Sequence, residues 1–303
     1  MGKYDLLEDI ANYENWIKIV QIDKGWSHDK KFYIEDKLEN KFLLRLCDAN
    51  LYEKKKEDFH ILSKLYDSGI PMGMPIDFGY CGNGECSYLL FSWVDGDDAI
   101  ESICELSNEK QYILGYESGV ILKKIHSIKA PSHIEDWESR FNKKIDIGLK
   151  NYKECGITIE NEEKVMKFIA ESRAFLKNRP STFQHGDYHL GNFIINDKKE
   201  LKIIDFNRCD YGDPWEEFNR LVFTYTVSEP FAVGSIHGYF ENNVPDEFFK
   251  LLALYCARDV LASIPWSIPY GEEDIKVAIE NGKKTIESYD GFEKVIPSWY
   301  RAP

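Results

Sequence analysis

The sequence is poor in several features that would place the chain in a special class of protein. It holds only seven cysteines in 303 residues, an odd number scattered along the chain, so we expect reduced thiols in a cytoplasmic protein rather than a disulfide framework. Basic residues are also few, 38 against 52 acidic ones, and the net charge of −14 argues against nucleic acid and anionic membranes as partners. No apolar run approaches the roughly 20 residues of a membrane span, and the first residues show no secretory signal.

The residues that are present indicate a globular protein. Hydrophobic residues make up 43% of the chain and charged residues 30%, which separates it from disordered sequences. A chain of this length favours two structural units over one. The acidic surplus has two interpretations, a solvated surface or the lining of a site for a cationic small molecule, and composition alone does not separate them.

The first part of the chain alternates short β-rich runs with polar turns. Five strands are expected at 16–23, 31–36, 41–48, 74–80 and 86–94. Between the third and the fourth, residues 51–69 carry apolar side chains at helical spacing and end at Gly69. The polar segment 94–98 then interrupts the pattern and is the expected linker between two domains.

Beyond residue 98 the pattern becomes helical. Helices are expected at 109–128, 134–154 and 160–179, and further helices after Pro214 are expected to break at Pro230, Pro245, Pro265 and Pro269. Strand character returns once, in a hairpin formed by residues 193–196 and 201–206. This order of elements predicts a β-rich small lobe followed by a larger helical lobe with one inserted hairpin.

The densest group of chemically active residues is Gln-His-Gly-Asp-Tyr-His-Leu-Gly-Asn at 184–192. His185, Asp187 and His189 alternate there, which is one way to arrange two imidazoles around a metal ion. A zinc site of that kind requires a third protein ligand and an open position, and nothing in the sequence singles out such a ligand. The second interpretation is that the segment presents Asp187 and Asn192 for a different reaction.

Asp205 supports the second interpretation. It ends the hairpin eighteen residues after Asp187 (205 − 187), and because a hairpin returns the chain to its start, we expect Asp205 beside Asp187 and Asn192. Carboxylate and amide oxygens are hard ligands of the kind that Mg²⁺ takes together with phosphate and water. This is the arrangement that phosphoryl transfer needs: Asp187 orients the acceptor hydroxyl and accepts its proton, while Asn192 and Asp205 hold Mg²⁺.

The pattern His-Gly-Asp-x-His-x-x-Asn followed by Ile-Asp-Phe resembles the catalytic loop and metal-binding segment of the aminoglycoside phosphotransferase and choline kinase family. The resemblance implies an α+β, bilobal protein-kinase-like fold, with residues 1–94 as a nucleotide-binding N-lobe and residues 95–303 as the C-lobe. It also implies ATP or GTP as co-substrate, Mg²⁺ as cofactor, and transfer to a hydroxyl group of a small molecule. The sequence gives no indication of the oligomeric state.

The resemblance assigns a phosphate-binding cation to the N-lobe. Arg45 lies on the third expected strand, where kinases usually carry a lysine that grips the nucleotide phosphates. Arginine binds phosphate through two parallel N–H groups, so it is a workable replacement. Glu57 on the next helix is the expected partner of this cation. The alternatives are a surface strand residue for Arg45 and an ordinary exposed helix charge for Glu57.

Four further positions acquire nucleotide-binding roles from the resemblance. Backbone groups near Ser27 would face the phosphates, a role that needs no particular side chain. Main-chain groups of Ser92 and Val94 would meet the edge of the adenine. His189 stands where protein kinases carry a phosphate-contacting lysine, and the alternative is a solvent-exposed loop histidine.

Acidic residues of the C-terminal half provide the expectation for the acceptor. In this architecture the acceptor lies between the catalytic loop and the C-terminal helices, where Glu216, Glu217 and Asp259 would contact a cationic molecule. An aminoglycoside-like antibiotic is therefore the favoured acceptor, with choline, a macrolide or another small hydroxy metabolite as alternatives. The competing class of function is a kinase-shaped protein that binds nucleotide without turnover. The presence of the catalytic and both metal-binding residues favours the enzyme.

Overall fold

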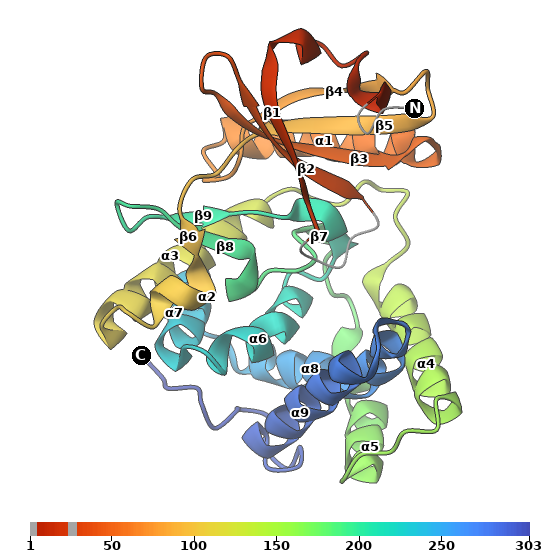
Figure 1. The fold of residues 1–303 in the computed structure, drawn as a ribbon. Helices are drawn as coiled ribbons and strands as arrows, with labels where there is room; N and C mark the ends of the chain where they lie inside the picture. The colour runs from red at the N-terminus through yellow and green to blue at the C-terminus, as the bar shows by residue number, and fades with distance from the viewer. Residues whose placement is uncertain (1–4, 24–28) are drawn as a thin grey trace. The chain divides into compact units, whose positions relative to one another are not determined.

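The chain forms two compact units in the computed structural model, which describes residues 5–23 and 29–303 (Figure 1). Unit 1 comprises Met1–Asp97 and Ile194–Asn207, and unit 2 comprises Asp98–Phe193 and Arg208–Pro303. The hairpin after the His-Gly-Asp segment therefore packs with the N-terminal part of the chain, whereas the division expected at residue 94 counts it with the C-terminal part.

Unit 1 is built on an antiparallel sheet that has five strands among the described residues, in the order β1-β2-β3-β5-β4. The strands are β1 Trp16–Ile22, β2 Lys30–Asp36, β3 Lys41–Asp48, β4 Pro75–Cys81 and β5 Cys86–Ser92. Each lies close to the run expected from the sequence, because short runs bounded by polar turns are typical of strands.

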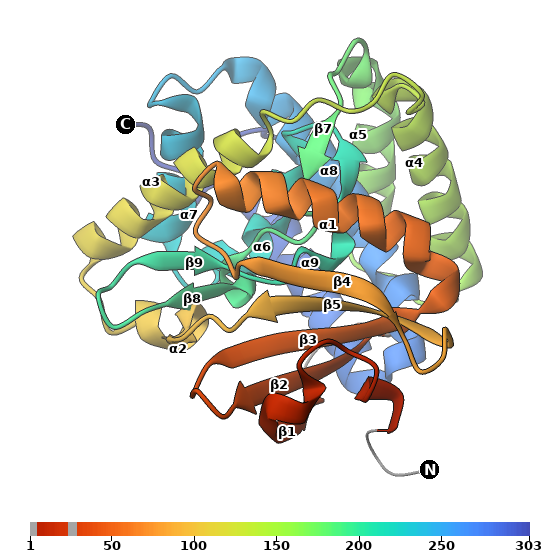
Figure 2. The same cartoon turned by 90° about the horizontal axis from the view of Figure 1, so that it is seen from above.

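The two faces of this sheet carry different chemistry, since successive side chains of a strand point to opposite faces. On β3, Leu44 and Leu46 join the apolar core that also contains Leu7 and Ile10. Helix α1, Tyr52–Asp67, lies across the sheet in Figure 2 and makes its strand contacts with β4 and β5. Arg45, between two core leucines in sequence, points to the opposite face from them.

A short hairpin completes unit 1. Strands β8 Phe193–Ile195 and β9 Leu201–Ile203 form a sheet with β6 Asp97–Asp98. The N–H of Ile203 donates to the carbonyl of Pro71 at 2.8 Å, which ties the hairpin to the segment after α1. The chain then reaches Asp205 in a left-handed conformation, with φ of 63°.

Unit 2 is mainly helical. Its α-helices in the described chain are α2 Ala99–Ile103, α3 Asn108–Ile125, α4 Trp137–Glu154, α5 Glu162–Ser172, α6 Val222–Tyr225, α7 Glu229–Phe240, α8 Asp246–Ser267 and α9 Glu272–Ser288. The side chains of Ser107, Asp136 and Ser228 accept N–H groups at the starts of α3, α4 and α7. Two short antiparallel strands, β7 Thr182–Gln184 and β10 Asp210–Gly212, are too brief for the sequence to signal.

Helices α3 and α7 pack unusually closely, as their side-by-side course in Figure 1 shows. Gly115 and Gly119 of α3 face Gly234 and Gly238 of α7. A Cβ at any of these four positions would overlap the backbone of the other helix. The His-Gly-Asp segment is hydrogen-bonded to this closely packed helix pair through Tyr188, whose hydroxyl donates to the carbonyl of Ser118 on α3.

Helix α8 corrects two expectations. The segment Asp246–Tyr270 is long and apolar enough to cross a membrane, with a mean hydropathy of 1.3 in its most apolar window. Its composition follows from its place in the core, because Leu252, Leu254 and Ala257 are fully buried and α4, α5 and α9 pack around it. Pro265 lies inside α8, two residues before its end at Ser267, rather than ending the helix itself.

Candidate active site

The His-Gly-Asp segment is anchored by the carboxylate of Glu217. The N–H groups of His185 and Gly186 donate to its two oxygens at 2.8 and 2.5 Å. His126 Nε2 lies 3.1 Å from the same group, and its Nδ1 lies 3.0 Å from the hydroxyl of Tyr239. The Glu217 side chain is only 1% exposed. Both oxygens are occupied by the protein itself, so we no longer assign Glu217 an acceptor contact.

Gly186 is required by the geometry of the same turn. Its φ of +85° is a left-handed conformation that side chains disfavour, and a Cβ would overlap the backbone of Arg208. The next residues are fixed from the other side by Tyr188, whose hydroxyl donates to the carbonyl of Ser118 on α3 at 2.7 Å. Asp187, between the two anchors, therefore has a backbone that is held on both sides.

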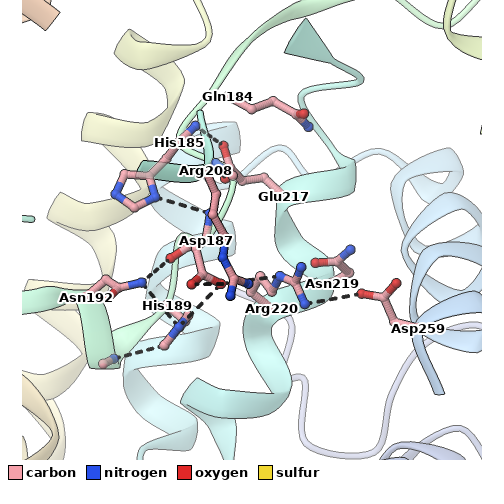
Figure 3. Close-up of polar contacts among 12 residues, drawn as sticks. Gln184, His185, Asp187, His189, Asn192, Arg208, Glu217, Asn219, Arg220 and Asp259 are labelled. Carbon is pink, nitrogen blue, oxygen red and sulfur yellow. Dashed lines mark hydrogen bonds and ion pairs between the residues drawn. The ribbon is translucent and has the colours of Figure 1, made fainter. Parts of the chain in front are cut away.

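The carboxylate of Asp187 lies among a histidine and two arginines (Figure 3). Oδ1 lies 3.6 Å from His189 Nε2 and 3.6 Å from Arg220 Nε, and Oδ2 lies 3.8 Å from Arg208 Nη1. Burial alone would raise the pKa of Asp187, but His189, Arg220 and Arg208 together hold that pKa well below its ordinary value. Asp187 is therefore ionised throughout the neutral range.

The side chain of Asn192 is positioned by the backbone of Asp187, the candidate catalytic residue. Its amide Nδ2 donates to the carbonyl of Asp187 at 2.8 Å and lies 3.3 Å from His189 Nε2. Among the described residues, no hydrogen bond is accepted by its oxygen Oδ1. The sequence spacing of five residues thus produces a side chain that is fixed through its nitrogen and presents its oxygen.

The two histidines do not form a metal clamp. His185 Nδ1 accepts the N–H of Asp187 at 3.3 Å, and His189 Nδ1 accepts the N–H of Gly191 at 3.1 Å. In residues 5–23 and 29–303, no group of three or more His, Cys, Asp or Glu side chains is arranged to hold a metal ion. Each imidazole instead shapes the loop locally.

The segment that carries Glu217 and Arg220 is itself pinned by Asp213. This carboxylate is fully buried and accepts two hydrogen bonds from Arg179, at 2.6 and 2.8 Å, and one from the hydroxyl of Tyr255 at 2.6 Å. It also accepts the N–H of Trp215 at 3.0 Å, and the Arg179 guanidinium lies over the Trp215 ring. A satisfied buried network of this kind fixes the backbone that follows it.

In unit 1 a second polar cluster forms around Arg45. The guanidinium donates to Asp205 Oδ1 at 2.7 Å and lies 3.3 Å from Asp29 Oδ2, and the arginine side chain is 7% exposed. Lys55 of α1 lies 3.4 Å from the same Asp29 oxygen and donates to Asn207 Oδ1 at 2.9 Å. The cluster therefore has two cations, with Asp29 between them.

This cluster departs from the expected pairing of Arg45 with Glu57. Glu57 is exposed on α1, and among the described residues it forms no ion pair or hydrogen bond with Arg45. The helix presents Lys55, two residues earlier, which places a second cation where an acidic partner was expected. The reason is helical phase, because residues two apart face different sides of a helix.

The remaining nucleotide-site candidates are placed unevenly. Ser27 lies outside the described residues. The N–H of Ser92 donates to the carbonyl of Met74 at 2.9 Å and so is used within unit 1. In the described part of the chain, the N–H of Val94 has no hydrogen-bond partner. Of the two residues expected to meet the adenine through main-chain groups, only Val94 has an N–H that donates to no described residue.

The residues expected to hold Mg²⁺ fit that ion in chemistry. Asp205 supplies a carboxylate, and Asn192 supplies an amide oxygen that accepts no hydrogen bond from the described residues, so both are hard donors. The left-handed backbone of Asp205 is a costly conformation for a residue with a side chain, and such strain concentrates at functional positions. Asp205 belongs to unit 1 and Asn192 to unit 2, so their convergence on one ion stays a prediction.

A pocket of 390 Å³ opens within unit 2, and its lining includes Gly186, Arg208 and Arg220 next to Asp187. Glu216 lines it too, but its carboxylate lies 3.3 Å from Lys144 and accepts a hydrogen bond from Gln184. Arg208 and Arg220 were not singled out from the sequence. The available signals were their positions, three residues after Asp205 and three after Glu217.

Asp259 is an ion-pair partner rather than a free carboxylate. It accepts a hydrogen bond from Arg258 at 2.7 Å and lies 3.6 Å from Arg220. Burial would raise its pKa, but the charges of Arg258 and Arg220 lower it. Asp259 therefore orients Arg220, which in turn lies beside Asp187.

An N-terminal unit with a five-stranded antiparallel sheet and one helix, joined to a helical unit that carries an anchored aspartate loop, is a kinase-like fold. The profile of the phosphotransferase enzyme family (APH) matches residues 18–248. The chain belongs to this family. The fold and the family expected from the sequence are confirmed.

Solved structures of similar fold share little sequence with the chain. A mutant of aminoglycoside 2'-phosphotransferase-IIIa in its GDP complex is 12% identical, with a TM-score of 0.71 over 95% of this chain and 97% of that one. The apo form of a thermostable mutant of aminoglycoside phosphotransferase APH(4)-Ia is 15% identical, with a TM-score of 0.65 over 92% and 97%. Amicoumacin kinase hAmiN in complex with AMP-PNP and Ca²⁺ is 12% identical, with a TM-score of 0.63 over 92% and 90%. No curated protein matches the sequence.

Proposed function

We propose that this protein transfers the γ-phosphoryl group of ATP or GTP to a hydroxyl group of a small molecule. The observation that carries the proposal is the state of Asp187, a rigidly held carboxylate whose pKa is lowered by its contacts with His189, Arg220 and Arg208. Family membership supports the reaction class, because the matched family is one of phosphotransferases.

Asp187 binds and orients the acceptor hydroxyl. As the acceptor oxygen bonds to the γ-phosphorus, the bond from that phosphorus to the β–γ bridging oxygen breaks, the hydroxyl proton passes to Asp187, and the nucleoside diphosphate leaves. A carboxylate with a lowered pKa is a weak base toward a free alcohol. In a loose transition state the proton moves late, so positioning is the larger contribution of Asp187.

In this proposal Asn192 and Asp205 would hold the metal ion, and Arg45 and Lys55 would contact the phosphates. A bound Mg²⁺ would offset the charge of the phosphate oxygens. Arg45 offers the forked N–H geometry that suits phosphate, while Lys55 offers a point charge. Val94 meets the nucleotide base through its free N–H. His189 fixes the position of Asn192 and lies beside Asp187.

The acceptor is a small hydroxylated molecule. Among the structural neighbours, one is a complex with hygromycin B, another is a complex with gentamicin, and a third is an amicoumacin kinase. These neighbours keep the hydroxyl groups of antibiotics among the candidate acceptors. The cationic, aminoglycoside-like acceptor favoured by the acidic composition depended on Glu216, Glu217 and Asp259. The internal contacts of all three weaken that preference, so choline, macrolides and other hydroxy metabolites stand beside it as acceptors.

The test is acceptor-dependent turnover. The protein is incubated with Mg·ATP or Mg·GTP and each member of a panel of aminoglycosides, macrolides, hydroxy amines and hydroxy acids, and nucleoside diphosphate release is followed with the mass of the acceptor. We expect one acceptor class to gain a phosphoryl group and Asp187→Asn to lose the reaction. Intact nucleotide binding with no modified acceptor would instead support the non-catalytic class of kinase-like proteins.

A further inference from the structure

Arg208 and Arg220 differ from the other arginines of unit 2 in their hydrogen bonding. Arg179 makes two hydrogen bonds to Asp213, and Arg140 donates to Asp210 at 2.8 Å and to the carbonyl of Tyr211 at 2.7 Å. In the described part of the chain, Arg208 and Arg220 donate no side-chain hydrogen bond at all. Their ion-pair distances to Asp187, 3.8 and 3.6 Å, exceed hydrogen-bond length.

Both guanidinium groups face the pocket beside Asp187 (Figure 3). Their side chains are 36% and 31% exposed, so they are accessible without being freely solvated. Each carries five N–H donors in a fixed fork. The pocket therefore presents unused donors next to the group that binds the acceptor hydroxyl.

The acidic residues that line the pocket are each compensated by another group. Glu135 lies 2.6 Å from Lys143, Glu216 lies 3.3 Å from Lys144, and Asp210 is paired with Arg140. The fourth lining carboxylate, Glu217, is buried in the hydrogen bonds that anchor the His-Gly-Asp segment. A cationic acceptor would have to break these pairs, whereas an anionic group would meet guanidinium donors that make ion-pair contacts but no hydrogen bond to any described residue.

The position of Arg208 is fixed by an aromatic ring. Its guanidinium lies 5.4 Å from the ring centroid of Trp266, a residue of α8 that is 47% exposed. Cation–π packing of this kind orients the guanidinium plane. On the other side, Asp259 holds Arg220 at 3.6 Å and is itself hydrogen-bonded to Arg258. Both guanidinium groups are thus oriented by contacts within the protein, which lowers the entropy cost of binding an anion.

We propose that the acceptor carries an anionic group, a carboxylate or a phosphate, close to the hydroxyl that is phosphorylated, and that Arg208 and Arg220 bind this group in the unit 2 pocket. The inference rests on the proposed phosphotransferase function and names its substrate class. It replaces the expectation of a purely cationic acceptor: an amine is compatible with it only on a molecule that also bears an anion.

The wild-type protein provides the first arm of the test through acceptor pairs that differ in one anionic group. Serine is compared with serinamide, glycerate with glyceramide, and galacturonate with galactose, and glycerol 3-phosphate is compared with glycerol to test a phosphate in place of a carboxylate. We expect kcat/KM to favour an anionic member by about 10–100-fold, the size of a charge-assisted paired hydrogen bond. Equal rates within every pair, or a preference for amine-rich acceptors without an anion, would overturn the inference.

Variants provide the second arm. Arg208→Gln and Arg220→Gln should raise the KM of the anionic acceptor and reduce its advantage over the neutral partner, with a smaller change for the neutral member. Arg173→Gln is the matched control, because Arg173 forms an exposed ion pair with Asp146 outside the pocket. Arg208→Lys tests the fork separately, since it keeps the charge and loses the planar geometry.

The outcomes separate this inference from the proposed function. If no acceptor of any charge is phosphorylated, the phosphotransferase function itself has failed. If transfer occurs but both arginine variants lower kcat equally for charged and neutral acceptors at unchanged KM, the two groups act on the transferring phosphoryl, and the anionic acceptor is refuted.

Discussion

Arg45 on β3 donates a hydrogen bond to Asp205 at 2.7 Å across 160 residues of sequence, within unit 1. The expected phosphate-binding cation and one expected metal ligand are thus paired with each other. Binding of a metal nucleotide would replace this ion pair by two others, between Arg45 and phosphate and between Asp205 and the metal. The pair keeps both groups oriented and prevents either charge from standing alone in a largely buried place.

Asp205→Asn is expected to abolish the metal-dependent part of nucleotide binding. The amide keeps the shape of the side chain but removes the charge that a divalent ion requires. Calorimetric titration of ATP and GTP with and without Mg²⁺ measures the effect. Affinity that responds to Mg²⁺ as strongly in the variant as in the parent would contradict the assignment. Asp197→Asn, in the exposed turn of the same hairpin, serves as the control.

Lys55→Met is expected to weaken nucleotide binding, while Glu57→Gln leaves it unchanged. Lys55 is buried beside Asp29 and Asn207, whereas Glu57 is exposed on the same helix. We expect about a tenfold or greater loss of affinity for Lys55→Met, because one charge-assisted contact is worth about 1.5–3 kcal/mol. Dissociation constants of the two variants decide the question. A larger effect of Glu57→Gln would restore the pairing expected from the sequence.

Asp187→Asn is expected to lower kcat by about 10²–10⁴-fold with little change in nucleotide affinity, the range for loss of a positioned acid–base group. The variant keeps the size of the side chain and its contacts to the loop. Steady-state kinetics with an acceptor that the panel shows to be phosphorylated, together with nucleotide titration, measure both quantities. Near-normal turnover would remove Asp187 from the reaction.

The lowered pKa of Asp187 predicts a specific dependence of stability on pH. In the unfolded chain the carboxyl titrates near its ordinary value of 3.8, and in the folded protein it titrates lower. Its contribution to the free energy of unfolding is therefore complete above pH 4 and is lost as pH falls through the folded value. Urea unfolding of the parent and of Asp187→Asn should differ by a constant amount from pH 5 to 8, and the difference should shrink toward pH 2. A difference that varies between pH 5 and 8 would show another titrating group.

Glu217→Ala is expected to destabilise the protein and disorder the His-Gly-Asp segment. The substitution leaves the buried N–H groups of His185 and Gly186 without acceptors, and each orphaned donor costs about 1–3 kcal/mol. Chemical denaturation measures the loss. Glu293→Gln removes an exposed carboxylate paired with Lys164 and should change stability by less than about 1 kcal/mol. Equal stability of the two variants would mean that Glu217 does not anchor the segment.

The sequence by itself determined the elements of the fold and the reaction class. Short β-rich runs separated by polar turns placed the five strands of unit 1 close to their observed bounds. The spacing of Asp187, Asn192 and Asp205 carried the family, since backbone geometry of one loop and one hairpin fixes those intervals. Constraints of this kind involve residues close together in sequence, so the sequence alone is enough to predict them.

Only the tertiary structure decided which charges face each other. Lys55 and Glu57 are alike in sequence as helix charges, and packing of α1 against the sheet buries one and exposes the other. Arg208 and Arg220 come from separate segments and meet at Asp187 because β7–β10 pairing and the Asp213 network set the two backbones. Glu217 was expected to contact the acceptor and instead holds the His-Gly-Asp segment. Long-range electrostatic pairing depends on distances that the linear order of residues does not contain, and so the charge of the acceptor could be argued only from the folded protein.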